Sequence, residues 1–272
     1  MAKPQIEMTN AGIDLLHSFP AIDEFGKQRE VSLTGERPLT IYLDKQEIVT
    51  LMTMGAQPEL LTLGYLRNQG LVSAIEDVLA IQVDWDVDAV AVTTRQRGAN
   101  TNIDQLLSKR TVTSGCGQGT MFGDVMATLD QLIVHCPTFS AEMIYQVLEG
   151  LRDYNQMYKT AGAVHGCALC SMMGEVEIFV EDVGRHNAVD AISGWMWLEE
   201  ISGQDKVFYT TGRLTSEMVI KVAQMEVPLL LSRSGATEMG LRLAQQVGMG
   251  MVARAKGKHF LVFNGFDSFV HD

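Results

Sequence analysis

Residues 206–232 read KVFYTTGRLTSEMVIKVAQMEVPLLLS, and this stretch decides the fold class of the chain. An apolar strand pattern covers Lys206–Thr210, helical spacing covers Ser216–Met225, and a second strand pattern covers Val227–Ser232. Strands that alternate with helices of these lengths indicate an α/β layer structure. The sequence therefore predicts a sheet with helices packed on it, built around this stretch.

The same alternation continues on both sides. Before the stretch, Glu175–Glu181 has the pattern of a strand and Asn187–Glu200 that of a helix. After it, the sequence predicts a helix over Glu238–Val247 and strands over Met249–Ala253 and Phe260–Phe263. We therefore expect residues 121–272 to form an α/β domain.

The first part of the chain is less regular. Residues 1–36 show weak periodicity and are expected to form a loosely held arm. Residues 37–120 are expected to form a smaller α+β part that ends in a cysteine-containing loop. Remaining predicted elements are a hairpin over Pro38–Leu51, strands over Val78–Val83 and Ala89–Thr94, and helices over Glu59–Asn68, Asn102–Lys109, Met121–Val134 and Ser140–Met157.

Cys116 lies in the glycine-flanked run Ser114-Gly115-Cys116-Gly117, shortly after the basic pair Lys109-Arg110. Glycines leave the backbone free and the thiol uncovered, and nearby cations favour the reactive thiolate. A structural cysteine usually lies within an apolar periodic run, which this one does not. The pattern favours a reactive thiol on a flexible loop. A glycine-rich turn that happens to contain a cysteine is the plainer alternative.

Composition limits the class of protein. The 272 residues include only four cysteines, which is unlike the disulfide framework of a small secreted domain. The start of the chain does not resemble a signal peptide, and no apolar run approaches the ~18 residues that span a bilayer. A formal net charge of −12 argues against non-specific binding to nucleic acid. A cytoplasmic protein with no membrane and no nucleic-acid partner is expected.

Basic residues nevertheless gather near the end of the chain, at Arg242 and within residues 254–259. A local cationic patch on an acidic protein suggests a small anionic ligand. A strand edge protected by charge explains the same residues equally well.

Three polar segments follow predicted strands, at residues 181–187, 210–217 and 232–238. Each contains glycine for a tight turn and an arginine, Arg185, Arg213 or Arg233, that can pair with an anion. Ligands of open α/β sheets bind beyond the carboxyl ends of the strands, where helix N-termini offer free N–H groups. The segments therefore predict a phosphate-binding rim that includes Ser234. Ordinary helix capping explains the serines and threonines but not the arginines.

Two histidines and two cysteines are weaker candidates for functional residues. His186 and His165 could orient a ligand or move a proton, although lone histidines are more often structural. Cys167 and Cys170 form a C-x-x-C pair that, with His165, suggests zinc, but no second pair stands at the usual spacing. The run Cys167–Met173 is small and apolar, typical of a helix packed against a sheet, so core cysteines are the favoured interpretation. The sequence contains no P-loop and no HExxH or GxSxG motif.

Taken together, these segments resemble the FdhD family of formate dehydrogenase accessory sulfurtransferases. The likeness extends from about Arg37 to Phe263. It is most specific in the run EDVGRHNAVD at residues 181–190, and it includes Ser114–Gly117, Gly162–His165 and Ser234–Thr237.

The resemblance implies a cytidine-deaminase-like α/β fold with a mixed sheet flanked by helices and without the zinc site of the deaminases. It implies that sulfur arrives from a cysteine desulfurase as a persulfide on Cys116. The sulfur then passes to the molybdenum or tungsten bis-pyranopterin guanine dinucleotide cofactor of formate dehydrogenase, which is bound as a substrate. It also implies a homodimer. The family's cofactor-binding segment corresponds to Arg254, Ala255, Lys256, Gly257, Lys258 and His259.

The chain departs from the family pattern in one loop. The family commonly has C-G-x-C-G, whereas residues 116–119 read Cys-Gly-Gln-Gly. A second thiol could discharge a persulfide as sulfide and leave a disulfide, and Gly119 removes that route. Two alternatives to a sulfurtransferase therefore stay open. One is a chaperone that binds the cofactor without covalent chemistry. The other is a zinc deaminase relic, although the motifs that deaminases require are missing.

Overall fold

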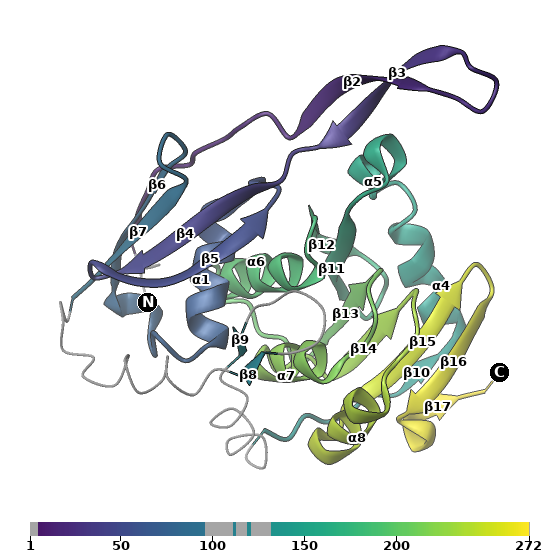
Figure 1. The fold of residues 1–272 in the computed structure, drawn as a ribbon. Coiled ribbons are helices and arrows are strands. Elements are labelled where there is room, and N and C mark those ends of the chain that lie inside the picture. Colours follow the sequence, from purple (N-terminus) through teal and green to yellow (C-terminus); the bar gives the residue numbers. More distant parts are fainter. Residues whose placement is uncertain (1–4, 96–110, 113–118, 121–131, 272) are drawn as a thin grey trace.

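The computed structural model describes residues 5–95, 111–112, 119–120 and 132–271. Its larger sheet has six strands in the order β12-β11-β13-β14-β15-β16 (Figure 1). The central strands β13, β14 and β15 are mutually parallel, and the outer neighbours are antiparallel. The predicted mixed sheet is thus confirmed. In sheet order the strands are Val176–Asp182, His165–Ser171, Lys206–Thr210, Leu229–Ser232, Gly250–Lys256 and His259–Asn264.

Helices cover both faces of this sheet. One face packs against α6 (Arg185–Leu198), α7 (Ser216–Gln224) and α8 (Glu238–Val247), and the other packs against α4 (Ala141–Gly150). Successive strand residues point to opposite faces, so both faces of the central strands are apolar. Phe208 and Leu230 pack toward α6–α8, whereas Val207, Leu229 and Leu231 pack toward α4. The confirmed α/β layers follow from this two-sided burial.

A second sheet is formed by the N-terminal part. Its order is β1-β6-β7-β4-β5, in which β4 and β5 form the predicted hairpin. The helix α1 (Pro58–Asn68) joins this sheet to the larger one by packing against α6. In sheet order the strands are Glu7–Met8, Val78–Asp84, Ala89–Thr94, Arg37–Leu43 and Gln46–Thr53, and a short 3-10 turn covers Ile75–Asp77.

The crossing of α1 and α6 depends on two glycines. A Cβ at Gly64 would overlap the carbonyl oxygen of Asp190, and a Cβ at Gly194 would overlap that of Leu60. The helix backbones therefore approach as closely as glycine alone allows. Beside this contact Asn68, Asp190 and Lys221 form a buried polar network across three helices.

Two predicted helices are different in the structure. Ser140–Met157 was expected to be one helix, but α4 ends at Gly150 and α5 (Gln156–Ala161) starts separately. Asn155 between them has a left-handed backbone (φ 49°), which a continuous helix does not tolerate. The predicted helix over Cys167–Met173 is wrong, because most of that run is strand β11. A short apolar run buried on both faces does not distinguish strand from helix by periodicity.

Residues 1–36, expected to form a loosely held arm, contain regular structure. The strand β1 pairs with β6, and β2 (Leu16–Ile22) and β3 (Gln28–Thr34) form a hairpin that projects from the body above α5 (Figure 1). The remaining short elements are β8 (Thr111–Val112), β9 (Gly119–Thr120), β10 (Phe139–Ser140), β17 (Phe269–Val270) and the 3-10 turn Phe266–Ser268. The predicted helix over Asn102–Lys109, and most of the one over Met121–Val134, lie outside the described residues.

Candidate functional site

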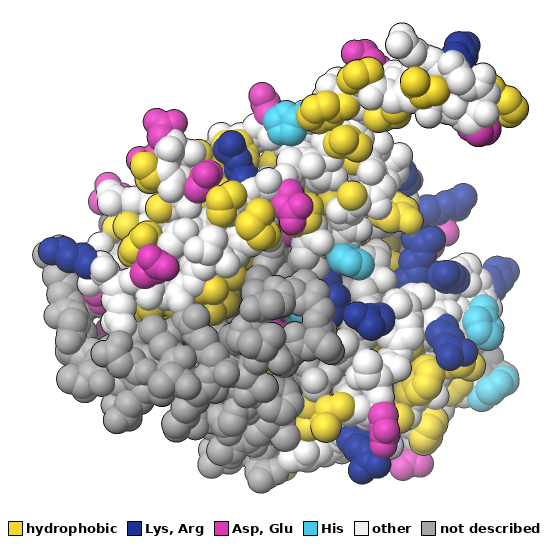
Figure 2. All heavy atoms as spheres, viewed as in Figure 1, with side chains coloured by type: hydrophobic (Ala, Val, Ile, Leu, Met, Phe, Trp, Pro, Cys, Tyr) yellow, Lys and Arg dark blue, Asp and Glu magenta, His cyan; other side chains and the backbone are white. Residues whose placement is uncertain are grey.

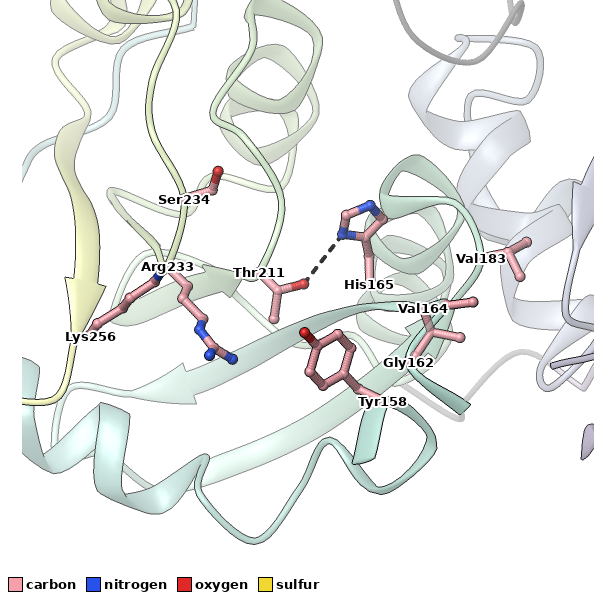
Figure 3. A pocket seen from close by; sticks show the side chains of 10 residues that line it. Tyr158, Gly162, Val164, His165, Val183, Thr211, Arg233, Ser234 and Lys256 are labelled. Carbon is pink, nitrogen blue, oxygen red and sulfur yellow. Dashed lines mark hydrogen bonds between the residues drawn. The ribbon is translucent and has the colours of Figure 1, made fainter. Parts of the chain in front are cut away.

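A pocket of about 520 Å³ lies at the edge of the larger sheet where the parallel strands β13, β14 and β15 end. The antiparallel strand β11 begins at this edge, and β12 ends there, so segments far apart in the sequence meet in one place (Figure 3). The volume is within the usual range for a small-molecule site. The described residues that line it are Tyr158, Gly162, Ala163, Val164, His165, Val183, Thr211, Arg233, Ser234 and Lys256.

The charge of this pocket is opposite to that of the whole chain. Arg233 and Lys256 are exposed cations, and none of the described lining residues is Asp or Glu. In Figure 3, both side chains lie on the same side of the pocket. Cations gathered in a concave site of an acidic protein attract a small anion rather than a polymer. Arg233 was noted in the sequence only as one member of a polar loop, and the pocket gives it a specific place.

Hydrogen bonds hold the second and third predicted loops together at this edge. The hydroxyl of Ser232 donates to the carbonyl of Gly212 (2.7 Å), and the N–H of Thr237 donates to the carbonyl of Leu214 (3.0 Å). The first loop contributes Val183 to the pocket lining. The prediction that three strand-end loops meet at one rim is therefore confirmed, while binding of a ligand there stays a prediction.

The basic segment 254–259 spans the end of β15 and the turn into β16. Arg254 has a left-handed backbone (φ 56°), and its N–H donates to the carbonyl of Ser234 (2.8 Å). Ala255 is buried, Lys256 reaches the pocket, and Gly257, Lys258 and His259 are exposed. Figure 2 shows Lys and Arg side chains over this flank of the molecule. The predicted patch and rim thus join at Ser234 and Lys256.

Arg185 lies below the surface at the start of α6. Its side chain is buried, and the Nε and Nη2 donors have no hydrogen-bond partner among the described residues. Gly212 lies directly against it, since a Cβ there would come within 2.7 Å of the Arg185 Cδ. Buried donors without partners are costly, so this guanidinium suits an anionic partner. Arg213, in the neighbouring loop, is exposed.

His165 lines the pocket and is close enough to these two arginines to be affected by their charges. Burial, followed by the positive charges of Arg185 and Arg213, lowers the pKa of His165 below its ordinary value. The ring is therefore neutral at pH 7 and able to accept or donate a hydrogen bond. Its Nδ1 lies 3.5 Å from the hydroxyl of Thr211, which also accepts from the N–H of Gly166 (3.0 Å).

His186 is in the first turn of α6, and its buried side chain faces α7. Its Nε2 is 3.2 Å from a carboxylate oxygen of Glu217, and the residue is 2% exposed. Burial, with the charges of Lys221 and Arg185, lowers the pKa of His186 to about 2. A neutral, enclosed imidazole can support the start of α6, and direct binding of a cofactor by His186 stays an untested prediction.

Other polar residues of the run at 181–190 join the two sheets. Asp182 accepts hydrogen bonds from the Thr53 hydroxyl (2.6 Å) and the Met54 N–H (3.1 Å), both at the end of β5. Asn187 donates to the carbonyl of Met52 (2.7 Å). Glu181 accepts from the N–H groups of the first turn of α5. Sequence reasoning assigned this run to a ligand rim and missed its part in docking the N-terminal sheet.

The cysteines have different environments. Cys116 lies outside the described residues, between the paired strands β8 and β9 along the chain. Cys167 and Cys170 are fully buried in β11, and burial raises the pKa of each thiol to about 12. The interpretation of these two as core cysteines is confirmed. In the described part of the chain, no three or more His, Cys, Asp or Glu side chains are grouped to hold a metal ion.

Comparisons with known proteins agree with this architecture. The model of the FdhD/NarQ family matches residues 34–270. A sulfur carrier protein FdhD from Wolinella succinogenes is 28% identical over 247 residues, covering 89% of this chain and 85% of that protein. One from Listeria monocytogenes serotype 4b is 29% identical, with coverage of 88% and 91%.

A solved structure is also similar. The crystal structure of a protein from Desulfotalea psychrophila, described as a formate dehydrogenase accessory protein, superposes with a TM-score of 0.73 at 25% identity. The match covers 94% of this chain and 98% of that one. Among the helices that the structure describes, none is both long and apolar enough to span a bilayer.

Proposed function

Because the chain belongs to the FdhD/NarQ family, we propose that it is a sulfur carrier that serves formate dehydrogenase. Relatives named as sulfur carrier proteins and a structural neighbour described as a formate dehydrogenase accessory protein support this function. The observation that carries the proposal is the cationic pocket at the end of β13–β15, on a chain whose net charge is −12. Such a pocket suits the phosphates of a guanine dinucleotide cofactor.

The first chemical step is sulfur loading on Cys116. Its thiolate attacks the outer sulfur of a persulfide on a cysteine desulfurase, and the sulfur–sulfur bond of that persulfide breaks. The desulfurase thiolate leaves, and the transferred sulfur is now bonded to Cys116. Lys109 and Arg110, close in sequence, favour the attacking thiolate.

The second step passes the outer sulfur to the cofactor, which is the substrate. The Cys116 thiolate is then the leaving group. Release of the sulfur as sulfide consumes two electrons, which a second thiol can supply by forming a disulfide. Gly119 stands where the family commonly has that thiol, so the electrons come from an external thiol or from the reduced substrate.

The described residues would bind and orient this substrate. Arg233 and Lys256 offer charge at the pocket surface, and Arg185, whose charge acts on His165 of the lining, has donors without a partner among the described residues. Arg213 and the segment 254–259 extend the positive surface beyond the pocket, where a second nucleotide arm of the cofactor can lie. The neutral ring of His165 adds a hydrogen bond without adding charge.

Mass spectrometry tests the loading step. After incubation with a cysteine desulfurase and L-cysteine, we expect one sulfur atom, about 32 Da, added to Cys116. Cys116→Ala should lose the adduct, and Cys136→Ala is the matched control that should keep it. Full activation of formate dehydrogenase by Cys116→Ala would exclude the covalent mechanism.

A non-covalent chaperone for the cofactor is the second candidate, and Gly119 in place of a second thiol favours it. The two functions differ in the adduct, because a chaperone needs none. Both require the pocket, so GDP binding should fall at least about tenfold in Arg233→Ala/Lys256→Ala. Arg242→Ala is the control, since Arg242 pairs with Glu238 on α8 outside the pocket lining.

The partners in this proposal are a cysteine desulfurase, formate dehydrogenase and a second copy of the chain. Cysteine usage supports action in the cytoplasm, because Cys136, Cys167 and Cys170 are free thiols. Pull-down of the desulfurase and of formate dehydrogenase with the full chain tests the first two partners. The choice between molybdenum and tungsten needs metal analysis of the loaded client.

A further inference from the structure

The pocket at the end of β13–β15 has a charged side and an uncharged side. Figure 3 shows Arg233 and Lys256, from the ends of β14 and β15, on one side of it. Gly162 and Val164, which follow α5, lie on the other side, and Tyr158 lies between the two groups. A ligand that fits both sides has an anionic part and an uncharged part, as a nucleotide does.

Tyr158 presents an uncovered aromatic ring to this pocket. The residue is in α5 and is 47% exposed. Within the described part of the chain, no other aromatic ring packs against it. A flat ring of this kind offers a stacking surface to a heteroaromatic base. Because single exposed aromatic residues are common on protein surfaces, the ring must also be held in place to act as a binding surface.

The backbone of Tyr158 is held by a carboxylate. The two oxygens of Glu181 accept hydrogen bonds from the N–H groups of Met157 (3.1 Å) and Tyr158 (3.0 Å) in the first turn of α5. None of the residues of α5 is buried, so these hydrogen bonds and the contact with β3 keep the helix in position. A carboxylate close to a cationic pocket weakens the binding of an anion, and fixing the ring of Tyr158 gives Glu181 a reason to be there.

We propose that the ring of Tyr158 stacks on the base of a nucleotide whose phosphates bind Arg233 and Lys256, and that Glu181 positions this ring. The proposal rests on the proposed function, because it takes the same pocket and the guanine dinucleotide as its ligand. It adds the surface that recognises the base, which the sequence did not indicate. Glu181 is a positioning residue, since it acts on the ligand only through Tyr158.

Isothermal titration calorimetry of the full-length chain with GDP and with inorganic pyrophosphate tests the stacking. Both ligands have two phosphates, and only GDP has a base. Tyr158→Ala should weaken GDP binding about 5- to 150-fold, the range for stacking of one base on an aromatic side chain, and leave pyrophosphate binding unchanged. Tyr158→Phe should keep the GDP affinity, because the ring remains. Tyr42→Ala is the matched control, since Tyr42 is in β4 of the N-terminal sheet and outside the pocket lining.

The positioning role of Glu181 has its own readout, the ratio of GDP affinity to pyrophosphate affinity. Glu181→Ala removes two acceptors and one negative charge, so pyrophosphate should bind at least as tightly as in the wild type. The ratio should nevertheless fall, because the ring is no longer held. Adding Glu181→Ala to Tyr158→Ala should not lower the ratio further, since the effect of Glu181 passes through the ring.

Three results would overturn the proposal without touching the proposed function. Wild-type GDP affinity in Tyr158→Ala would exclude stacking, and equal losses in Tyr158→Ala and Tyr158→Phe would assign the contact to the hydroxyl. A further fall of the ratio in the double variant would exclude the positioning role. Retained pyrophosphate binding shows that each variant is folded with an intact pocket. A wild type that binds neither GDP nor pyrophosphate would instead refute the pocket, and with it both this proposal and the proposed function.

Discussion

Replacement of Lys221 by methionine should destabilise the protein strongly while leaving the size of the side chain nearly unchanged. The Lys221 ammonium donates to a carboxylate oxygen of Asp190 at 2.7 Å, and the two side chains are 1% and 0% exposed. The other oxygen of Asp190 accepts from the Asn68 amide at 2.7 Å. Lys221→Met leaves a buried carboxylate without its counter-charge, and breaking a buried pair in this way costs about 3–5 kcal/mol.

The pH dependence of the free energy of unfolding provides a second test of this prediction. Burial raises the pKa of Asp190, and the Lys221 charge opposes that increase. Lys221→Met removes this positive charge, so the pKa of Asp190 in the folded state rises further above its value in the unfolded state. A raised carboxyl pKa destabilises the fold at high pH, and protonation relieves the cost as the pH falls. The free-energy deficit of Lys221→Met should therefore shrink between pH 7.5 and pH 5.

Urea unfolding followed by circular dichroism measures these changes. Lys206→Met is the matched control, because Lys206 pairs with Glu177 at 2.8 Å on the surface. A partly exposed pair contributes about 0–1 kcal/mol, so that variant should unfold near the wild-type midpoint. Adding Asp190→Asn to Lys221→Met should restore part of the lost stability. Equal destabilisation by the two methionine variants, or a deficit that grows toward acid, would refute the reasoning.

Three further outcomes follow from the described contacts. Gly64→Leu should lower the free energy of unfolding by several kcal/mol, because its side chain would occupy the backbone of α6. Gly12→Leu is the control, since no atom lies within 4 Å of a Cβ at Gly12. Iodoacetamide at pH 8 should not modify Cys167 or Cys170 in the native protein, since both are buried and burial raises the pKa of each thiol to about 12. Labelling of either thiol at the rate of a free cysteine would contradict this burial. Asn187→Leu should cost about 1–3 kcal/mol by leaving the Met52 carbonyl without its donor, and an unchanged urea midpoint would show that this contact does not hold the two sheets.

The sequence predicted the second half of the chain closely because its strands and helices bury strong apolar patterns. Helix Glu238–Val247 and strand Lys206–Thr210 have the predicted bounds in the structure. The hairpin β2–β3 was not predicted, since none of its residues is buried and Pro20, which strands disfavour, lies within its first strand. The strand at Cys167–Ser171 was assigned to a helix, because small apolar residues buried on both faces fit either element.

The candidate site was predictable from the sequence only in part, because some of its contacts join residues that are far apart along the chain. Placing three loops at one sheet edge needs only the order of strands and helices, and Thr211 and Ser234 of two of these loops line the pocket there, whereas the meeting of Lys256 with them is a finding of the structure. The contact of Asp182 with Thr53 joins residues 129 positions apart, so no local pattern could show that this carboxylate binds the N-terminal sheet. Cys116 could be chosen from the sequence alone, and its environment lies outside the described residues.

The double role of the run at 181–190 affects how variants of it should be interpreted. Asp182 and Asn187 attach the N-terminal sheet, whereas Arg185 in the same turn presents donors near the pocket. Loss of formate dehydrogenase activation in a variant of Asp182 would therefore not identify a ligand-binding residue, because displacement of the sheet gives the same result. GDP affinity and the urea midpoint, measured together, separate the two causes. Arg185→Met should weaken GDP binding and keep or raise the midpoint, since it removes buried donors that lack partners in the described part of the chain, whereas Asp182→Leu should lower the midpoint first.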